Sequence, residues 1–159
     1  MRTININVPV TVKEAHELTT WETRLVEEAQ MATYRSYAPY SCFSVGSAVM
    51  LADNSIVSGS NQENAAYPSG ICAERTAVFY ANSRYPNLPI RAICIAARGT
   101  DGKLLPRPIP PCGACRQVLL EAEKRAGDDI EVLLYGTEYS YCLRNVKDLM
   151  PVAFDSSLL

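Results

Sequence analysis

Three cysteines and one glutamate stand where two amphipathic runs of the sequence begin. Cys72 lies two positions ahead of Glu74 in "SGICAERTAVFY". Cys112 and Cys115 lie three positions apart in "PPCGACRQVLLEAEK". Residues three apart on a helix share one face, so the second pair is close enough to hold a single ion. Because the partial positive charge of a helix N-terminus stabilises thiolates, all three sulfurs could serve as metal ligands.

Taken alone, the Cys112–Cys115 pair has two interpretations, a redox dithiol or a small structural zinc site. Cys72 favours a site of three thiolates, whereas a closed structural zinc site needs a fourth protein ligand. The single histidine, His16, lies far away in a polar stretch, where we expect a solvated side chain. Three ligands would leave one coordination position of a zinc ion for water, as in catalytic zinc sites.

Glu74 and Arg75 would then have distinct duties beside the metal. Zinc lowers the pKa of a bound water molecule toward about 7, but three thiolates weaken this effect because they make the site anionic. A neighbouring base such as Glu74 could take the proton and later deliver it to a substrate. The alternative for Glu74 is an acidic residue that the helix dipole favours in a first turn. Arg75 could hydrogen-bond to sulfur and temper the negative charge.

The bulk composition limits the partners of the chain. Its 159 residues, 48% hydrophobic and 20% charged, fit one globular domain. A net charge of −2 and a pI near 5.4 argue against nucleic acid or an anionic membrane surface as the main partner. No apolar run approaches the roughly 20 residues that cross a bilayer, and no secretory signal is visible. We expect a cytoplasmic protein with reduced thiols, in which Cys42, Cys94 and Cys142 are structural.

Hydrophobic periodicity predicts the elements that position these residues. Three helices are expected, from Trp21 (with Thr20 as N-cap) to before Tyr37, over 72–85, and over 112–127. Five strands are expected, over 43–51, 56–60, 89–98, 129–136 and 139–145. The stretch 4–10 alternates like a short strand, which Pro9 confines to an edge or to a surface arm. Strands that alternate with crossover helices predict an α/β layered domain with a partly parallel sheet.

The two cysteine segments fit a known signature. "CAE" at 72–74 and "PCGAC" at 111–115 match the pattern of zinc-dependent nucleobase deaminases, with cysteine as the first ligand. The blocks "YAPYSCFSVGSAV", "NQENAAYPSGICAERTA", "PCGACRQVL" and "DLMPVAF" resemble the small homotetrameric cytidine deaminases in their usual order, over about residues 21–154. The resemblance implies a three-layer α/β/α fold with a mixed five-stranded sheet. It also implies a catalytic domain over 21–159 that follows an N-terminal extension over 1–20.

The resemblance also assigns roles to individual residues. One Zn²⁺ per subunit would be held by Cys72, Cys112 and Cys115, with Glu74 as the proton shuttle and Arg75 near the sulfurs. The substrate contacts implied are Phe43 on the pyrimidine, Asn61 and Glu63 on the ribose 3′ side, Tyr67 in a substrate loop, the Ala73 N–H on the base, and Phe154 in a neighbouring subunit's site. Core packing is the alternative for the two phenylalanines, and a solvated loop is the alternative for Asn61 and Glu63.

The reaction implied is the hydrolytic deamination of cytidine and deoxycytidine to uridine and deoxyuridine with release of ammonia, in pyrimidine salvage. The expected substrate is a nucleoside. We expect a homo-oligomer, a tetramer, to complete the site. We expect neither nucleic acid nor a membrane as a partner. One rival is a blasticidin-type deaminase, a group that usually lacks the Asn61 and Glu63 pair. A non-catalytic zinc module would not require Glu74. A reductase built on Cys112 and Cys115 would leave Cys72 and Glu74 unexplained.

Overall fold

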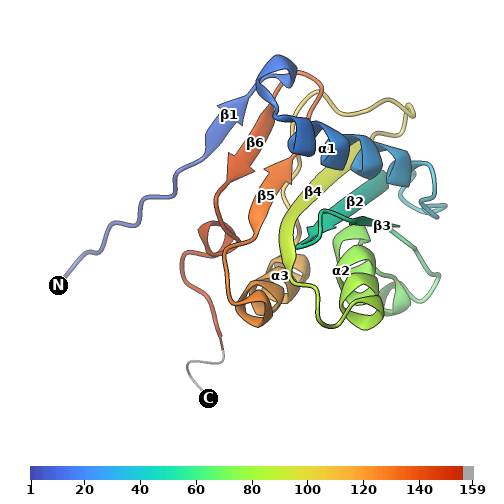
Figure 1. Cartoon of the computed structure of the whole chain (residues 1–159). Helices are drawn as coiled ribbons and strands as arrows, with labels where there is room; N and C mark the ends of the chain where they lie inside the picture. The colour runs from blue at the N-terminus through green and yellow to red at the C-terminus, as the bar shows by residue number, and fades with distance from the viewer. Residues whose placement is uncertain (156–159) are drawn as a thin grey trace.

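The strand-forming segments join in one six-stranded sheet, in the order β1-β6-β5-β4-β2-β3 (Figure 1). The structure is a computed structural model that describes residues 1–155. Its strands are β1 (Thr11–Lys13), β2 (Ser44–Leu51), β3 (Ile56–Ser60), β4 (Ile90–Arg98), β5 (Glu131–Leu134) and β6 (Ser140–Leu143). Its α-helices are α1 (Thr20–Thr33), α2 (Ala73–Arg84) and α3 (Gly113–Ala126). Single 3₁₀ turns lie at Ala15–Glu17, Tyr67–Ser69 and Lys147–Leu149.

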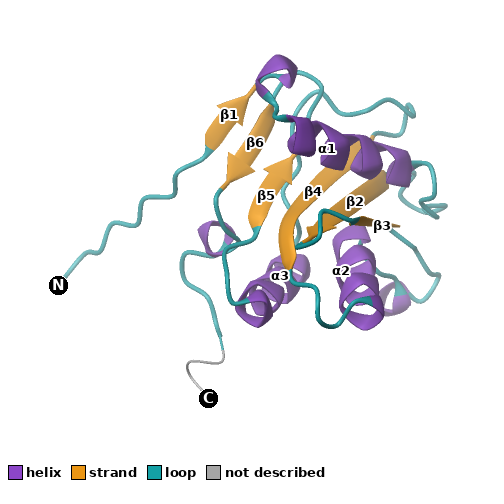
Figure 2. Ribbon diagram, in the orientation of Figure 1, coloured by secondary structure: helices purple, strands orange, loops and turns teal. Residues whose placement is uncertain are grey.

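The sheet is mixed because one pair of neighbouring strands is parallel. Helix α3 links β4 to the parallel strand β5, whereas all other neighbouring strands are antiparallel. The hairpin of β2 and β3 turns at Asn54, whose φ of 66° is a left-handed conformation that asparagine tolerates. Helix α1 covers one face of the sheet, and α2 and α3 cover the other (Figure 2). The predicted three-layer α/β/α fold is confirmed.

The predicted number of strands was wrong, since the sheet has six strands rather than five. The additional strand is β1, which pairs antiparallel with β6 at the edge of the sheet. The alternating stretch 4–10, in which we expected a short strand, lies in no helix or strand. A strand of three residues is too short for alternation to reveal it, and Pro9 cannot donate to a ladder in the stretch that does alternate.

Small residues allow α1 to lie directly on the sheet. Ala29 and Ala32 of α1 are fully buried. A Cβ atom added at Gly46 of β2 would lie 2.1 Å from the carbonyl oxygen of Ala29. Leu25 and Val26 then pack against β2 and β4 on this face. The close approach of helix and sheet therefore depends on glycine at position 46.

The three cysteines predicted to be structural differ in their surroundings. Cys94 is fully buried in β4, and this burial raises the pKa of its thiol. Cys142 is half-buried in β6, where burial raises the pKa of its thiol to about 11. Cys42 is exposed and has a φ of 52°, so burial does not account for it. Only Cys94 and Cys142 behave as packing residues.

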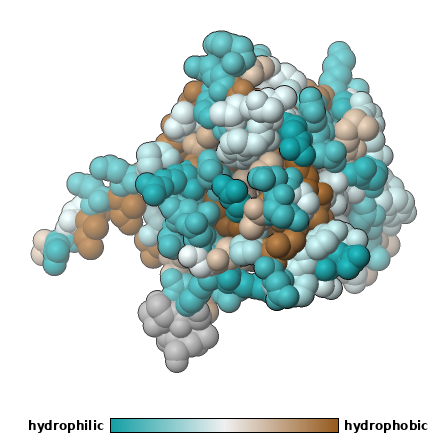
Figure 3. All heavy atoms as spheres, viewed as in Figure 1, coloured by the Kyte–Doolittle hydropathy of each residue, from teal (hydrophilic) through white to brown (hydrophobic). Residues whose placement is uncertain are grey.

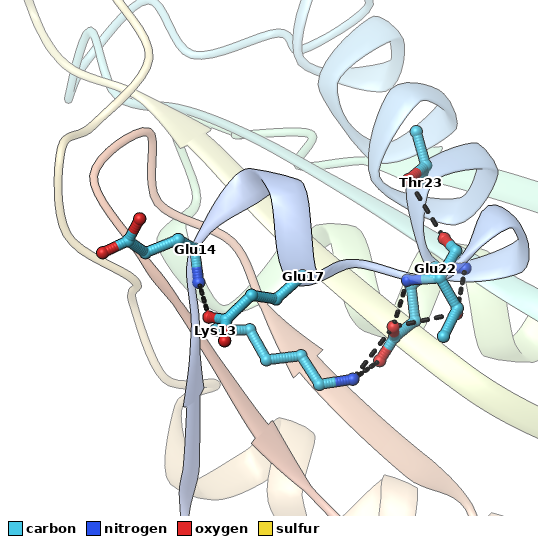
Figure 4. Close-up of polar contacts among 6 residues, drawn as sticks. Lys13, Glu14, Glu17, Glu22 and Thr23 are labelled. Carbon is cyan, nitrogen blue, oxygen red and sulfur yellow. Dashed lines mark hydrogen bonds and ion pairs between the residues drawn. The ribbon is translucent and has the colours of Figure 1, made fainter.

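An ion pair fastens the edge strand β1 to helix α1 (Figure 4). The Nζ atom of Lys13 lies 2.7 Å and 3.0 Å from the two carboxylate oxygens of Glu22. The backbone N–H and the hydroxyl of Thr19 each donate to Glu22 Oε2 at 2.8 Å. Thr19 is therefore the N-cap of α1, in a capping box with Glu22, and not Thr20 as predicted.

The first ten residues project from the body beyond β1 (Figure 1). Their apolar side chains remain exposed, Ile4 by 74% and Ile6 by 53%. In Figure 3 this projecting arm carries hydrophobic atoms that are separate from the main surface. No helix within residues 1–155 combines the length and apolar character needed to span a membrane.

The Lys13–Glu22 pair makes part of the stability depend on pH. Burial alone would raise the pKa of Glu22, but the hydrogen bonds from Lys13 and Thr19 outweigh it and lower the pKa below 4.5. The hydrogen bond to Glu22 raises the pKa of Lys13 above 10.5 against the effect of burial. A lowered acid pKa adds stability above the unfolded value, and a raised lysine pKa adds stability below it. The contribution is therefore greatest between these two pKa values.

We expect Lys13→Met to lower the free energy of unfolding at pH 7 by about 1–3 kcal/mol, because Glu22 would keep a buried charge without its partner. Urea unfolding of wild type and variant across pH measures this difference. The difference should shrink as the pH falls below 4.5 or rises above 10.5. The exposed Lys103, changed to methionine, is the matched control. A difference that stays constant from pH 4 to pH 11 would contradict the assignment.

Candidate metal centre and adjoining cavity

The first turns of α2 and α3 bring three sulfur atoms together. Cys72 is the N-cap of α2, Cys112 is the N-cap of α3, and Cys115 follows in the first turn of α3. The three Sγ atoms all lie within 4.8 Å of one another, and those of Cys72 and Cys112 are 3.9 Å apart. A tetrahedral zinc with Zn–S bonds of about 2.3 Å requires sulfur atoms about 3.8 Å apart. The donor type and spacing therefore fit zinc, and no other such cluster occurs among residues 1–155.

Local structure leaves the sulfur atoms available as ligands. Neither Cys72 nor Cys112 uses its side chain to cap its own helix. Burial raises the pKa of Cys112, but the N–H groups of Cys115 and Ala114 and the neighbouring thiols lower it below its ordinary value of 9.0. Cys115 is fully buried, and burial together with the nearby Glu74 charge raises the pKa of its thiol. The thiol of Cys112 therefore ionises more readily than the thiol of Cys115.

Glu74 is the second residue of α2 and lies at the inner end of a cavity beside the sulfurs. Glu74 is only 5% exposed. Burial raises the pKa of this carboxyl, and hydrogen bonds from its own N–H and from Cys115 offset part of the rise. A carboxyl group with a raised pKa is suited to accepting and releasing a proton near neutral pH.

Arg75 faces the sulfur cluster from the same helix turn. Its Nη2 atom lies 3.7 Å from Cys72 Sγ, and the hydrogen bond to Cys72 is the main cause that raises the pKa of the guanidinium. Its Nε atom is buried without a hydrogen-bond partner in the described part of the chain. The guanidinium is thus a positive charge beside the sulfur atoms.

The cavity beside the cluster has a volume of about 780 Å³ and reaches from the sulfurs to loops on both sides. Among the residues that line it are most of the predicted substrate contacts, namely Phe43, Asn61, Glu63, Tyr67 and Ala73. The volume lies within the range of about 300–1,000 Å³ that is usual for small-molecule sites. Residues far apart in the sequence therefore share one cavity with the three-thiol cluster.

Phe154 is the predicted site residue that the single chain does not bring to the cavity. Phe154 is 59% exposed, and its carbonyl oxygen accepts a hydrogen bond from Gln117 Nε2 at 3.0 Å. Its predicted position in the site of a neighbouring subunit stays a prediction. The last four residues of the domain predicted over 21–159 lie outside the described residues.

Several residues of the cavity wall were missed in the sequence. Tyr40 forms an edge-to-face pair with Tyr67, with ring centroids 5.9 Å apart. Ser41 and Ile109 also line the cavity. Tyr40 and Ser41 lie within the block "YAPYSCFSVGSAV", and Ile109 lies two positions before "PCGACRQVL", so the family resemblance is the only signal that could have indicated them. Their side chains alone carry no chemical pattern.

Asn61 is held by three hydrogen bonds within the protein. Its Oδ1 atom accepts from the hydroxyl of Ser36 and from the N–H of Val45 at 2.8 Å. Its Nδ2 atom donates to the carbonyl oxygen of Phe43 at 2.9 Å. An amide has two N–H donors and two acceptor positions on oxygen, so a single N–H of Asn61 remains for a ligand.

Glu63 is similarly engaged with the loop opposite. One carboxylate oxygen accepts from the N–H groups of Tyr40 at 2.9 Å and Ser41 at 3.2 Å. The other oxygen accepts from the Ser41 hydroxyl. The hydrogen bonds from Ser41 and Tyr40 lower the pKa of Glu63, so the group is ionised at neutral pH. About four acceptor positions are available on a carboxylate, which leaves one position for a ligand.

Comparison with known proteins identifies the family. A family model described as the cytidine and deoxycytidylate deaminase zinc-binding region matches residues 19–126. The chain belongs to this deaminase family. A cytidine deaminase of Halalkalibacterium halodurans is 42% identical over 130 residues, which cover 82% of this chain and 91% of the relative.

Solved structures agree with this membership. The crystal structure of cytidine deaminase from Burkholderia pseudomallei superposes with a TM-score of 0.71 at 37% identity, covering 86% of this chain and 100% of that one. Cytidine deaminase from Mycobacterium tuberculosis gives a TM-score of 0.66 at 31% identity and covers 86% of this chain and 98% of that one.

The deaminase match also bears on the cofactor. It runs from the N-cap of α1 to the end of α3, so both cysteine segments lie within a region described as zinc-binding. Together with the sulfur spacing, this supports one zinc ion in each chain of this deaminase. The predicted boundary at residue 20 stays a prediction.

We expect Gly59→Ala to disturb the metal centre from beneath. A Cβ atom at Gly59 of β3 would lie 2.6 Å from the nitrogen of Ala77 and 2.9 Å from the carbonyl oxygen of Ala73, so α2 must move. The free energy of unfolding of the variant should be about 1–3 kcal/mol lower. The variant should also retain less zinc, because Cys72 is the N-cap of α2 and would move with it. Chemical denaturation and metal analysis measure both effects.

The control for this prediction is Gly113→Ala, since a Cβ atom there meets nothing within 4 Å. That substitution lies next to a metal ligand but at the first position of a helix, so we expect it to leave stability and zinc content unchanged or slightly improved. Equal effects of the two substitutions would refute the proposed steric cause.

We expect Cys115→Ser to weaken zinc binding by more than about 100-fold, because a hydroxyl is a poor substitute for a buried thiolate ligand. Mass spectrometry of purified protein should find one zinc per wild-type chain and little in the variant. The exposed Cys42, changed to serine, should keep the full zinc content. Full zinc occupancy in Cys115→Ser would exclude the three-thiolate site.

Proposed function

We propose that the chain catalyses the hydrolytic deamination of cytidine and deoxycytidine, which yields uridine or deoxyuridine and ammonia. The observation that carries this proposal is the set of three sulfurs at zinc spacing with the buried carboxyl of Glu74 beside them, at the inner end of a cavity. Relatives named cytidine deaminase, at 42% and 37% identity, support the choice of substrate.

Zinc, when bound, supplies a Lewis acid that lowers the pKa of a water molecule. Glu74 would take one proton from the attacking water on a carboxylate oxygen and pass it to N3 of the pyrimidine, while the water oxygen forms a bond to C4. It would then move the remaining proton of that oxygen to the amino nitrogen on C4, so that the C4–N bond breaks, ammonia departs and the oxygen stays on C4 as the carbonyl of uridine. A single group can perform both transfers because burial keeps its pKa above the ordinary value for glutamate.

Two features of the cavity wall suit the base. Phe43 is half-buried and presents an aromatic ring on which a pyrimidine can pack. Ala73 is fully buried as the first residue of α2, where a backbone N–H has no partner within the helix. We propose that this N–H donates to the carbonyl oxygen of the base.

The charges in the cavity favour a nucleoside over a nucleotide. Among the described residues that line it, Arg75 is the only cation, and its guanidinium is turned toward Cys72. Glu63 and Glu74 are acidic, and Glu63 is ionised at neutral pH. A phosphate group would therefore meet negative charge without a partner cation.

The hydrogen-bonding capacity near Asn61 and Glu63 matches a single sugar hydroxyl. One N–H remains on Asn61 and one acceptor position remains on Glu63, and a hydroxyl can satisfy both at once. We assign this hydroxyl to the 3′ position, as the family resemblance implies. Because the pair has no capacity for a second hydroxyl, both ribose and 2′-deoxyribose nucleosides are expected substrates.

We further propose a homotetramer that acts in pyrimidine salvage in the cytoplasm. Exposed apolar side chains that an assembly could cover include Phe79 at 49%, Val152 at 87% and Phe154 at 59%. Sedimentation of the active protein tests this assembly. A fully active monomer would refute the role of Phe154 in a neighbouring site.

We expect Glu74→Gln to abolish turnover while zinc stays bound, because the amide cannot accept the proton that the water loses. The rate of deamination, followed as the rate at which ultraviolet absorbance is lost, should decrease by at least about 10²–10⁴-fold. Metal analysis of the same sample separates lost proton transfer from lost zinc. Full activity of this variant would favour a different catalytic base.

The substrate panel distinguishes the proposed activity from its rivals. Cytidine and deoxycytidine should be deaminated, whereas cytosine, adenosine and the 5′-monophosphates should not. Turnover of deoxycytidine monophosphate alone would move the chain to the nucleotide branch of the family. No turnover of any compound by the zinc-loaded protein would favour a non-catalytic zinc module.

A further inference from the structure

We infer that Ser36 is a positioning residue for sugar recognition, because its hydroxyl fixes the side-chain amide of Asn61. This inference rests on the proposed function, in which Asn61 contacts the sugar of a nucleoside. Ser36 does not itself line the cavity, so it would act on the substrate only through Asn61.

Ser36 connects the end of α1 with the cavity wall. It follows α1 by three positions, and its backbone N–H donates to the carbonyl oxygen of Thr33 at 3.3 Å. Its side chain is half-buried and donates to Asn61 Oδ1. The next residue, Tyr37, donates its N–H to the Asn61 carbonyl oxygen at 3.0 Å. The backbone of Ser36 is therefore hydrogen-bonded to the end of α1, and the backbone of the next residue is hydrogen-bonded to Asn61.

Among the three groups that hold the Asn61 amide, Ser36 contributes the only side chain. The other two are the N–H of Val45 and the carbonyl oxygen of Phe43, both on the backbone. Removal of the Ser36 hydroxyl leaves a partly buried acceptor position on Oδ1 without a donor. The amide is then held at two points instead of three, and its remaining N–H is less well directed toward a ligand.

The consequence should be selective for binding at the sugar. Asn61 and Phe43 are directly hydrogen-bonded, and both belong to the wall formed by β2, β3 and the loop before β2. Glu74 belongs to α2, whereas Ser36 follows α1 and Asn61 follows β3. A less well oriented Asn61 side chain should therefore bind the sugar hydroxyl more weakly and leave proton transfer at Glu74 unchanged.

The test compares Ser36→Ala with its parent in a protein that binds nucleosides without turning them over. Both proteins carry Glu74→Gln, and calorimetry measures the dissociation constants of deoxycytidine and 2′,3′-dideoxycytidine, which lacks the 3′-hydroxyl. We expect Ser36→Ala to weaken deoxycytidine binding by about 3–10-fold, the size of one lost hydrogen bond. Binding of the dideoxynucleoside should change by less than twofold.

Two control variants separate positioning from general damage. Ser36→Thr keeps the hydroxyl and should bind deoxycytidine as the parent does. Ser58→Ala is the matched control, since Ser58 is also half-buried and its hydroxyl accepts from Arg35 Nη2 at 2.7 Å, outside the cavity. It should leave both dissociation constants unchanged.

The outcomes separate this inference from the proposed function. Equal weakening of both nucleosides by Ser36→Ala, or no weakening of either, overturns the positioning role while turnover by the wild-type protein still supports the proposed function. If the parent binds no nucleoside and the wild-type protein deaminates none, both the proposed function and the role of Ser36 are wrong.

Discussion

The separation of the first turns of α2 and α3 decides whether this chain can hold a metal ion. Two side chains fix α3 through three hydrogen bonds. Glu123 Oε2 accepts from the N–H groups of Ile130 and Val146, and Arg116 donates to the carbonyl oxygen of Leu149. Helix α2 is placed by its close approach to Gly59. Zinc–sulfur bond lengths in protein sites vary by only about 0.2 Å, so packing far from the sulfurs contributes to the geometry of the site.

The cavity wall uses the same residues for structure and for recognition. Asn61 and Glu63 fasten the loop before β2 through hydrogen bonds to Phe43, Tyr40 and Ser41. Their remaining capacity, one donor and one acceptor, is what a ligand meets. A residue held in this way binds with little loss of side-chain entropy, which is the advantage of a preorganised site.

How much the sequence predicted depended on whether the signal was local. Cys72, Cys112 and Cys115 could be recognised because spacing and helix position are local properties, and the three helices followed from periodicity in the same way. Strand β1 could not, since three residues show no alternation and its anchor, the Lys13–Glu22 pair, joins two elements. The hydroxyl of Ser36 was also invisible, because its partner lies 25 positions away and a lone serine carries no pattern.

Charge explains why these parts occur together. Three thiolates exceed the two positive charges of a zinc ion, and a buried excess charge is costly unless it is paired. Arg75, 3.7 Å from Cys72 Sγ, supplies the missing positive charge. Glu74 then adds a carboxylate to a centre that is already balanced, in a residue only 5% exposed, so its ionised form is disfavoured. The burial that disfavours the ionised form of Glu74 raises the pKa of its carboxyl group, and this raised pKa is what enables the group to hold and release a proton.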